Sequence, residues 1–164
     1  MKLRLHIFLF CLLLLSCESK PEPKEFSSEA LSETLITLKG DKVTFQDMLN
    51  RYKSKTIVLD TWASWCADCL KAMPKVKATQ LSYPKAEYVF LSMDKSYKTW
   101  KEGIKRHKVT GQHYFVPSGW NGSFAKFIDL DWIPRYMVVD VNQKISVFNA
   151  VMVNDAKIIK CLTQ

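Results

Sequence analysis

Two cysteines stand two residues apart in the segment TWASWCADCLKAMP, which runs from Thr61 to Pro74. In this spacing Cys69 lies one helical turn beyond Cys66, close enough to form a disulfide with it. A thiol attacks a disulfide as its thiolate, and the start of a helix favours the thiolate through free backbone donors and the helix dipole. The pair therefore predicts thiol-disulfide exchange, in which Cys66 attacks a substrate disulfide and Cys69 resolves the mixed disulfide.

Two other interpretations of the cysteine pair stay open at this point. The pair can be a structural disulfide, or it can be half of a zinc site. Zinc needs four ligands at recognisable spacing, and the chain has no second pair of this kind. His107 and His113 are the only histidines after the first seventeen residues. We therefore expect no metal and no other cofactor.

The elements around the pair place it at the junction of a strand and a helix. Residues 56–61, TIVLDT, form an apolar run typical of a strand that is buried on both faces. Residues 66–81 are compatible with a helix, in which Pro74 removes one backbone donor. The thiols should thus stand where a central strand ends and a helix begins.

The rest of the chain alternates between strand and helix patterns. Further strands are expected at residues 35–38, 87–93, 113–116, 136–140 and 145–148, and further helices at 44–52, 97–107, 121–128 and 155–162. The last two strands should form an antiparallel hairpin. This order predicts one α/β domain, a mixed sheet with helices on both faces.

The N-terminus has the features of an export signal. Lys2 and Arg4 precede an apolar run that ends at Leu15, which is too short for a membrane span and typical of a signal peptide over residues 1–16. The sequence Leu14 to Cys17 resembles the lipobox of bacterial lipoproteins, which implies that Cys17 is lipidated. The alternative is an ordinary signal peptide in which Cys17 has no role.

The segment after Cys17 is expected to be a tether. Residues 17–30 combine charges, prolines and serines with little apolar surface, so we place the folded domain at residues 31–164. The protein should then be anchored to a bacterial membrane and face the periplasm, with the inner or outer membrane left open. The net charge of +8 is scattered, and export argues against a nucleic-acid partner.

The segment VLDTWASWCADCLKAMP resembles the active-site segment of thioredoxin-fold proteins, specifically the exported, membrane-tethered TlpA/ResA-like thiol-disulfide oxidoreductases. The resemblance rests on Asp60, Trp65, the two cysteines and Pro74. It implies a thioredoxin-like fold, with an insertion of the TlpA/ResA type at about residues 100–128. It also implies that Trp65 shields the disulfide and contacts the substrate.

The same resemblance assigns a role to Asp60. In thioredoxin a buried carboxylate occupies this strand position behind the resolving cysteine. Burial without a partner raises the pKa of an aspartate, which would make Asp60 a proton acceptor for Cys69. The alternative is that Asp60 is a hydrogen-bonded structural acid.

A second match to this family lies at residues 132–136, WIPRY. The resemblance implies a cis peptide bond between Ile133 and Pro134 that faces the disulfide, and a backbone at Ile133 that aligns the substrate. Ile133 is larger than the residue often found there and should narrow the groove.

Two residues depart from the family pattern or fall outside it. Asp68 stands between the cysteines where proline is common, and its charge should disfavour the thiolate of Cys66 and make the pair more reducing. Cys161 shares a helix face with Ile158 and Leu162 and should be a packed, inert thiol.

We therefore expect a membrane-anchored thiol-disulfide oxidoreductase that reduces exported disulfide-containing proteins and receives electrons from a membrane thiol donor. Three other functions stay open. They are a copper-binding or metallochaperone-like protein on the same fold, a peroxidase, and a redox-inactive scaffold.

Overall fold

The computed structural model describes residues 21–164. The expected signal peptide and Cys17 lie outside the described residues. The helices are α1 (Ser28–Leu31), α2 (Phe45–Arg51), α3 (Ala67–Ser82), α4 (Tyr97–His107), α5 (Ser123–Phe127) and α6 (Ala156–Leu162), with a 3-10 turn η1 (Gly119–Asn121). The strands are β1 (Thr34–Thr37), β2 (Lys42–Thr44), β3 (Ile57–Trp62), β4 (Glu87–Ser92), β5 (Gln112–Phe115), β6 (Arg135–Val139) and β7 (Ile145–Ala150).

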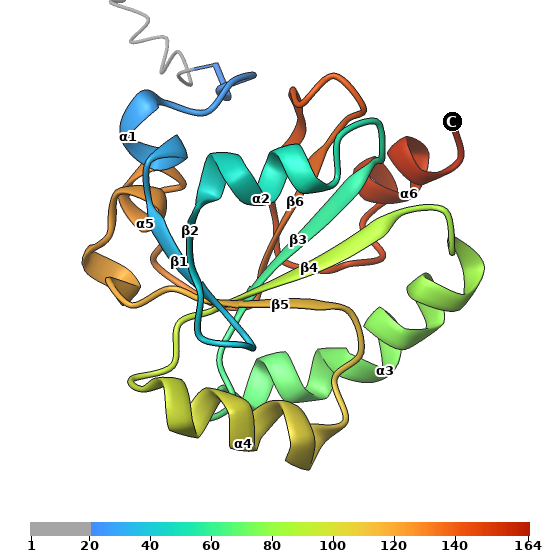
Figure 1. The fold of residues 1–164 in the computed structure, drawn as a ribbon. Coiled ribbons are helices and arrows are strands. Elements are labelled where there is room, and N and C mark those ends of the chain that lie inside the picture. The colour runs from blue at the N-terminus through green and yellow to red at the C-terminus, as the bar shows by residue number, and fades with distance from the viewer. Residues whose placement is uncertain (1–20) are drawn as a thin grey trace, which may run out of the picture.

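The strands form one seven-stranded sheet in the order β2-β1-β5-β4-β3-β6-β7 (Figure 1). The inner strands β3, β4 and β5 are parallel, whereas β6 and β7 form the antiparallel hairpin that the sequence predicts. The hairpin β1–β2 joins the other edge antiparallel to β5. The expected α/β class with a mixed sheet and helices on both faces is confirmed.

The strand β3 organises both layers of the core. All six of its residues are buried, which confirms the strand expected from TIVLDT. Side chains alternate along a strand, so Val58, Asp60 and Trp62 face the layer that holds α3 and α4. Ile57 and Leu59 face the opposite layer, which holds α2 and α5. The two apolar layers account for the helices on either side of the sheet in Figure 1.

The helix α3 begins directly at the cysteine pair. Cys66 is its N-cap residue, with extended backbone, and the helix then continues through Pro74 to Ser82. Pro74 is exposed, so its ring stands on the solvent side of the helix. Met73 and Val76 are buried and pack α3 onto the sheet. The short loop from β3 to α3 thus carries residues 63–65 and delivers Cys66 to the end of the central strand.

The region expected to hold an insertion forms α4, β5, η1 and α5. The strand β5 pairs with β4 on one side and with β1 on the other, so this region supplies the strand that joins the β1–β2 hairpin to the rest of the sheet. The sequence did not predict β2, which is only three residues long.

The folded domain starts earlier than the boundary at residue 31 that the sequence suggested. The Phe26 ring packs at 4.9 Å from the Phe45 ring, and Ala30 in α1 is fully buried. The Ile145 amide donates to the Lys24 carbonyl oxygen at 2.8 Å. The expected tether therefore ends before Lys24, because two apolar side chains and one backbone contact anchor a segment that is otherwise charged.

The helix α4 touches the loop before the cysteines at Gly103. A β-carbon at Gly103 would overlap the side chain of Ser64. In most helices Gly→Ala is stabilising by about 1 kcal/mol, but here we expect Gly103→Ala to lower the free energy of unfolding by about 1–3 kcal/mol through overpacking. Urea unfolding measures the free energy of unfolding of the wild type and the variant. The exposed Lys105→Ala on the same helix is the control, and a more stable Gly103→Ala variant would contradict the close approach.

Candidate active site

Cys66 and Cys69 form a disulfide at the N-terminus of α3, with their α-carbons 5.3 Å apart. Cys66 Sγ accepts a hydrogen bond of 3.1 Å from the backbone amide of Cys69. A donor in this position favours negative charge on the sulfur, as does the positive end of the helix dipole. Cys69 is fully buried and Cys66 is 6% exposed, so Cys66 is the sulfur nearer to solvent.

Asp60 is buried in β3, on the sheet face that packs against α3 and the cysteines. Neither carboxylate oxygen has a hydrogen-bond partner among residues 21–164. Burial raises the pKa of Asp60 from 3.8 to about 8. The alternative of a hydrogen-bonded structural acid therefore has no support among the described residues.

Tyr136 lies opposite Asp60 in the pairing of β3 with β6. Its hydroxyl is buried and has no hydrogen-bond partner within the described part of the chain. Burial raises the pKa of Tyr136, and the nearby charge of Asp60 raises it further. The sequence placed Tyr136 in a strand but gave it no role in the site, because only strand pairing brings it to Asp60.

The loop before β6 lies against the disulfide. The Ile133–Pro134 peptide bond is cis, as the family resemblance implied. The Ile133 carbonyl oxygen lies 3.5 Å from Cys66 Sγ. The buried Arg135 secures this loop, since its guanidinium donates to Asp131 at 2.5 Å and to the Ile128 carbonyl at 3.3 Å.

A buried carboxylate also holds the loop before Cys66. Asp94 accepts hydrogen bonds from the amide of Ser64 at 3.0 Å and from its hydroxyl at 2.6 Å. Ser92 at the end of β4 donates a third, at 2.7 Å. Asp94 was not among the residues predicted from the sequence to belong to the site. The only sequence signal was a carboxylate just beyond a buried strand.

Three tryptophans surround the opening above Cys66. Trp65, Trp120 and Trp132 line a cavity of about 360 Å³ together with Cys66 and Ile133. Trp65 and Trp132 are 56% and 59% exposed. Asp68 stands at the rim, where it forms an ion pair with Lys71 at 3.3 Å. Trp65 was predicted from the sequence to lie at the site, whereas Trp120, more than fifty residues away from Cys66, was not.

The remaining histidine and cysteine candidates lie away from this opening. His113 in β5 is buried, stacks on Phe90 and contacts the Val109 carbonyl oxygen at 3.1 Å through Nε2. Burial lowers the pKa of His113 to about 4. Cys161 is free and half-buried against the core, and burial raises its pKa. Within residues 21–164 no group of three or more His, Cys, Asp or Glu side chains is placed to hold a metal ion.

The model of a family described as thioredoxin-like matches residues 53–145, which include β3, the cysteine pair and the cis-proline loop. The chain belongs to the thioredoxin-like family. The expected thioredoxin-like fold is thereby confirmed.

Curated relatives of this thioredoxin-like chain include the thiol-disulfide oxidoreductase ResA of Bacillus cereus. It is 25% identical over 129 residues, which cover 77% of this chain and 70% of that protein. The thioredoxin-like protein YneN of Bacillus subtilis is 38% identical over 50 residues, or 30% of this chain and 27% of its own length.

Solved structures share the fold. The thioredoxin domain of a thiol-disulfide oxidoreductase from Bacteroides vulgatus has a TM-score of 0.66 at 20% identity and covers 85% of this chain and 97% of its own. A thiol-disulfide oxidoreductase from Bacteroides fragilis has a TM-score of 0.61 at 22% identity, with 71% and 86% covered. With its cysteine pair and these relatives, the thioredoxin-like chain is a thiol-disulfide oxidoreductase.

The described part of the chain, residues 21–164, contains no helix with the length and apolar character needed to cross a membrane.

The buried Asp60 should make the stability of the oxidised protein depend on pH. The pKa of Asp60 is about 8 in the folded protein, against an ordinary value of 3.8. As pH rises, the carboxyl group therefore loses its proton in the unfolded chain before it does so in the folded protein. The contribution of Asp60 to stability is then fully present below about pH 4 and falls as pH rises to about 8, with a loss of about 4 kcal/mol between pH 5 and pH 9. We expect Asp60→Asn to abolish this loss.

Urea unfolding of both oxidised proteins at the two pH values measures the difference. The control is Asp129→Asn, which removes an exposed carboxylate. Parallel pH dependence of wild type and Asp60→Asn would show that Asp60 is not the cause.

Proposed function

We propose that this protein is a membrane-anchored disulfide reductase that acts on exported proteins, with Cys66 as nucleophile and Cys69 as resolving thiol. The observation that carries the proposal is the Cys66–Cys69 disulfide at the start of α3, on the sheet face that holds the buried Asp60. The name of the relative ResA, a thiol-disulfide oxidoreductase, supports the same class of reaction.

The reaction begins with the reduced pair. The Cys66 thiolate attacks one sulfur of the substrate disulfide, a mixed disulfide forms, and the other substrate sulfur leaves as a thiolate. The Cys69 thiolate then attacks the Cys66 sulfur, which closes the Cys66–Cys69 bond and releases the second substrate thiolate. Two electrons pass to the substrate, and a membrane thiol donor returns them to the pair.

Asp60 is the proposed proton acceptor for Cys69. Cys69 is fully buried, so its proton has no direct path to solvent. A carboxylate with a pKa of about 8 is basic enough to take this proton near neutral pH, and Asp60 has no hydrogen-bond partner among the described residues. Asp60 would be charged before it accepts the Cys69 proton and neutral afterwards.

The substrate chain is proposed to lie along the cis-proline loop. Ile133 places its carbonyl oxygen 3.5 Å from Cys66 Sγ, so an extended substrate segment beside Ile133 and Pro134 would bring its own sulfur to Cys66. Trp65 offers an exposed aromatic face at the same opening. Backbone contact of this kind depends little on the side chains of the substrate.

The anchor and the direction of electron flow rest on the sequence. The lipobox-like segment that ends at Cys17 and the charged residues 18–23 would hold the domain near a bacterial membrane on its periplasmic side. Asp68, 48% exposed beside the pair, adds negative charge that disfavours the thiolate state and so makes the pair a better reductant. A membrane thiol donor is the partner that such a reductase requires.

A redox titration of the full chain in detergent micelles tests the direction. Tryptophan fluorescence is followed in graded thiol and disulfide buffers, with Cys66→Ser as the control that should show no transition. We expect a reversible two-electron transition at about −270 mV or lower. A potential above about −150 mV would reverse the proposed direction, and no transition at all would favour a structural disulfide or the copper-binding alternative.

The order of attack has its own test. Reduced Cys69→Ser should accumulate a stable mixed disulfide with a disulfide-containing substrate, because no thiol remains to resolve it. Cys66→Ser should form almost none, since Cys69 is fully buried. Mass spectrometry of the trapped species measures both. Equal trapping by the two variants would overturn the assignment.

The proposed effect of Asp68 is tested at the Cys66 thiol. In Asp68→Asn we expect the pKa of that thiol to fall by a few tenths of a unit and the potential to rise, because a like charge is lost. The ion pair with Lys71 keeps the change small. Ultraviolet absorbance of the thiolate against pH measures the pKa, and an unchanged or higher value would rule out this role.

A further inference from the structure

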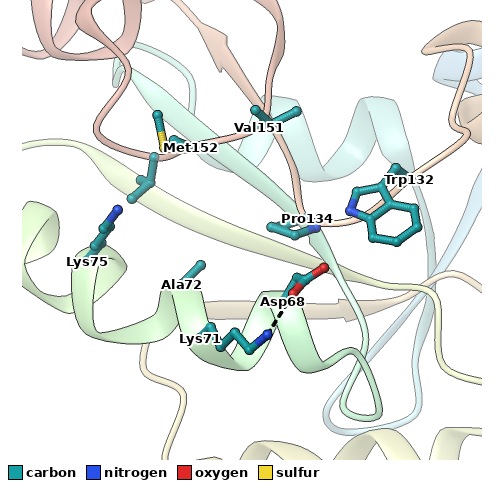
Figure 2. Close-up of a pocket in the computed structure, with 9 residues that line it drawn as sticks. Asp68, Lys71, Ala72, Lys75, Trp132, Pro134, Val151 and Met152 are labelled. Carbon is teal, nitrogen blue, oxygen red and sulfur yellow. Dashed lines mark hydrogen bonds and ion pairs between the residues drawn. The ribbon is translucent and has the colours of Figure 1, made fainter.

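A second cavity lies beside the redox pair, on the α3 side of the cis-proline loop. It has a volume of about 250 Å³, and Figure 2 shows the residues that line it. It shares Asp68 and Trp132 with the cavity above Cys66. Asp68 and Trp132 therefore border both cavities. The rest of its lining comes from the helix α3, from Pro134 in the cis-proline loop and from the segment after β7.

The two walls of this cavity differ in chemistry. One wall is apolar and exposed, with Trp132, Val151 and Met152 at 59%, 60% and 49% exposure. The other wall is α3, from which Lys71 and Lys75 project in Figure 2. Exposed apolar residues that cluster at the rim of a reactive site mark a contact surface for another molecule.

The charge on the helix wall is incompletely neutralised. Lys71 forms an ion pair with Asp68 at 3.3 Å, whereas Lys75 has no carboxylate within ion-pair distance among the described residues 21–164. The cavity therefore keeps a net positive charge next to an apolar wall. A segment that carries both acidic and apolar side chains complements such a surface.

We propose that this cavity is a specificity subsite that binds an extended segment of the substrate protein, with acidic side chains two to four residues from the reacting cysteine. The proposal deepens the proposed function and rests on it. The apolar residues of the segment would pack on Trp132 and Met152, and its carboxylates would pair with Lys71 and Lys75.

The spacing follows from the geometry of the two chains. A helix rises 1.5 Å per residue, so Lys71 and Lys75 lie about 7.5 Å and about 14 Å along α3 from Cys66. An extended chain rises about 3.3 Å per residue, so these distances correspond to about two and about four substrate residues. The lysine side chains are flexible, which allows some variation in this register.

Two synthetic peptides test the subsite. Both contain a single cysteine blocked as a mixed disulfide with thionitrobenzoate, and both have valine next to the cysteine. One has aspartate at the second and fourth positions on each side, and the other has asparagine there. When Cys66 attacks the peptide sulfur, thionitrobenzoate leaves as a thiolate whose absorbance is recorded.

With the reduced full chain we expect the aspartate peptide to react about threefold to tenfold faster at low salt, and the preference to shrink as salt screens the charges. Lys75→Glu should remove or invert the preference. The matched control is Lys77→Glu, which makes the same charge change on α3 but lies at a different cavity, next to Gln80 and Leu81.

The outcomes separate this inference from the function on which it depends. Equal rates for the two peptides, or the same preference in Lys75→Glu and Lys77→Glu, would overturn the subsite while leaving disulfide exchange intact. Reaction with neither peptide would overturn the proposed function as well. If the peptides react equally but Lys75→Glu weakens binding to vesicles that contain phosphatidylglycerol, the lysines face lipid headgroups, and the subsite is rejected.

Discussion

The site depends on one constraint, which is that β3 ends and α3 begins within a few residues of each other. This junction makes Cys66 the N-cap of a long helix at the end of the central strand. Two further parts of the site come from the strands that pair with β3. The strand β6 brings the Ile133–Pro134 loop to the Cys66 sulfur, and β4 leads into Asp94, which holds Ser64. Shifting this junction by one residue would separate the thiol from all of them.

The disulfide separates two environments of opposite character. On the sheet face that packs against α3, Asp60 is buried with no hydrogen-bond partner among the described residues, an arrangement that costs stability whenever the group is charged. Above the disulfide, exposed tryptophans and charged side chains meet solvent. The proposed proton transfer would require such a cost, because a carboxylate that had full hydrogen bonding would hold its charge and would not accept a proton near neutral pH.

The periphery of the fold shapes the opening above the thiols. The carboxylate of Glu33, before β1, accepts hydrogen bonds from the hydroxyls of Ser118 and Ser123 and from the Phe124 amide. This one buried acid ties the N-terminal part of the domain to the segment that carries Trp120. The aromatic rim is therefore supported by residues that are distant from Cys66 along the chain.

The sequence by itself determined the cysteine pair, the buried strand before it, the helix after it and most other elements, because each leaves a local pattern of several residues. It also identified Asp60 as an acid within an apolar strand. The short elements α1 and β2 escaped, since three or four residues are too few to show a period. Only the tertiary structure decided which distant residues join the site, such as Tyr136 opposite Asp60 and Met152 in the cavity that Trp132 also lines. These neighbours are set by strand pairing and by the packing of layers, which act between segments far apart in the chain and leave no mark in the local sequence.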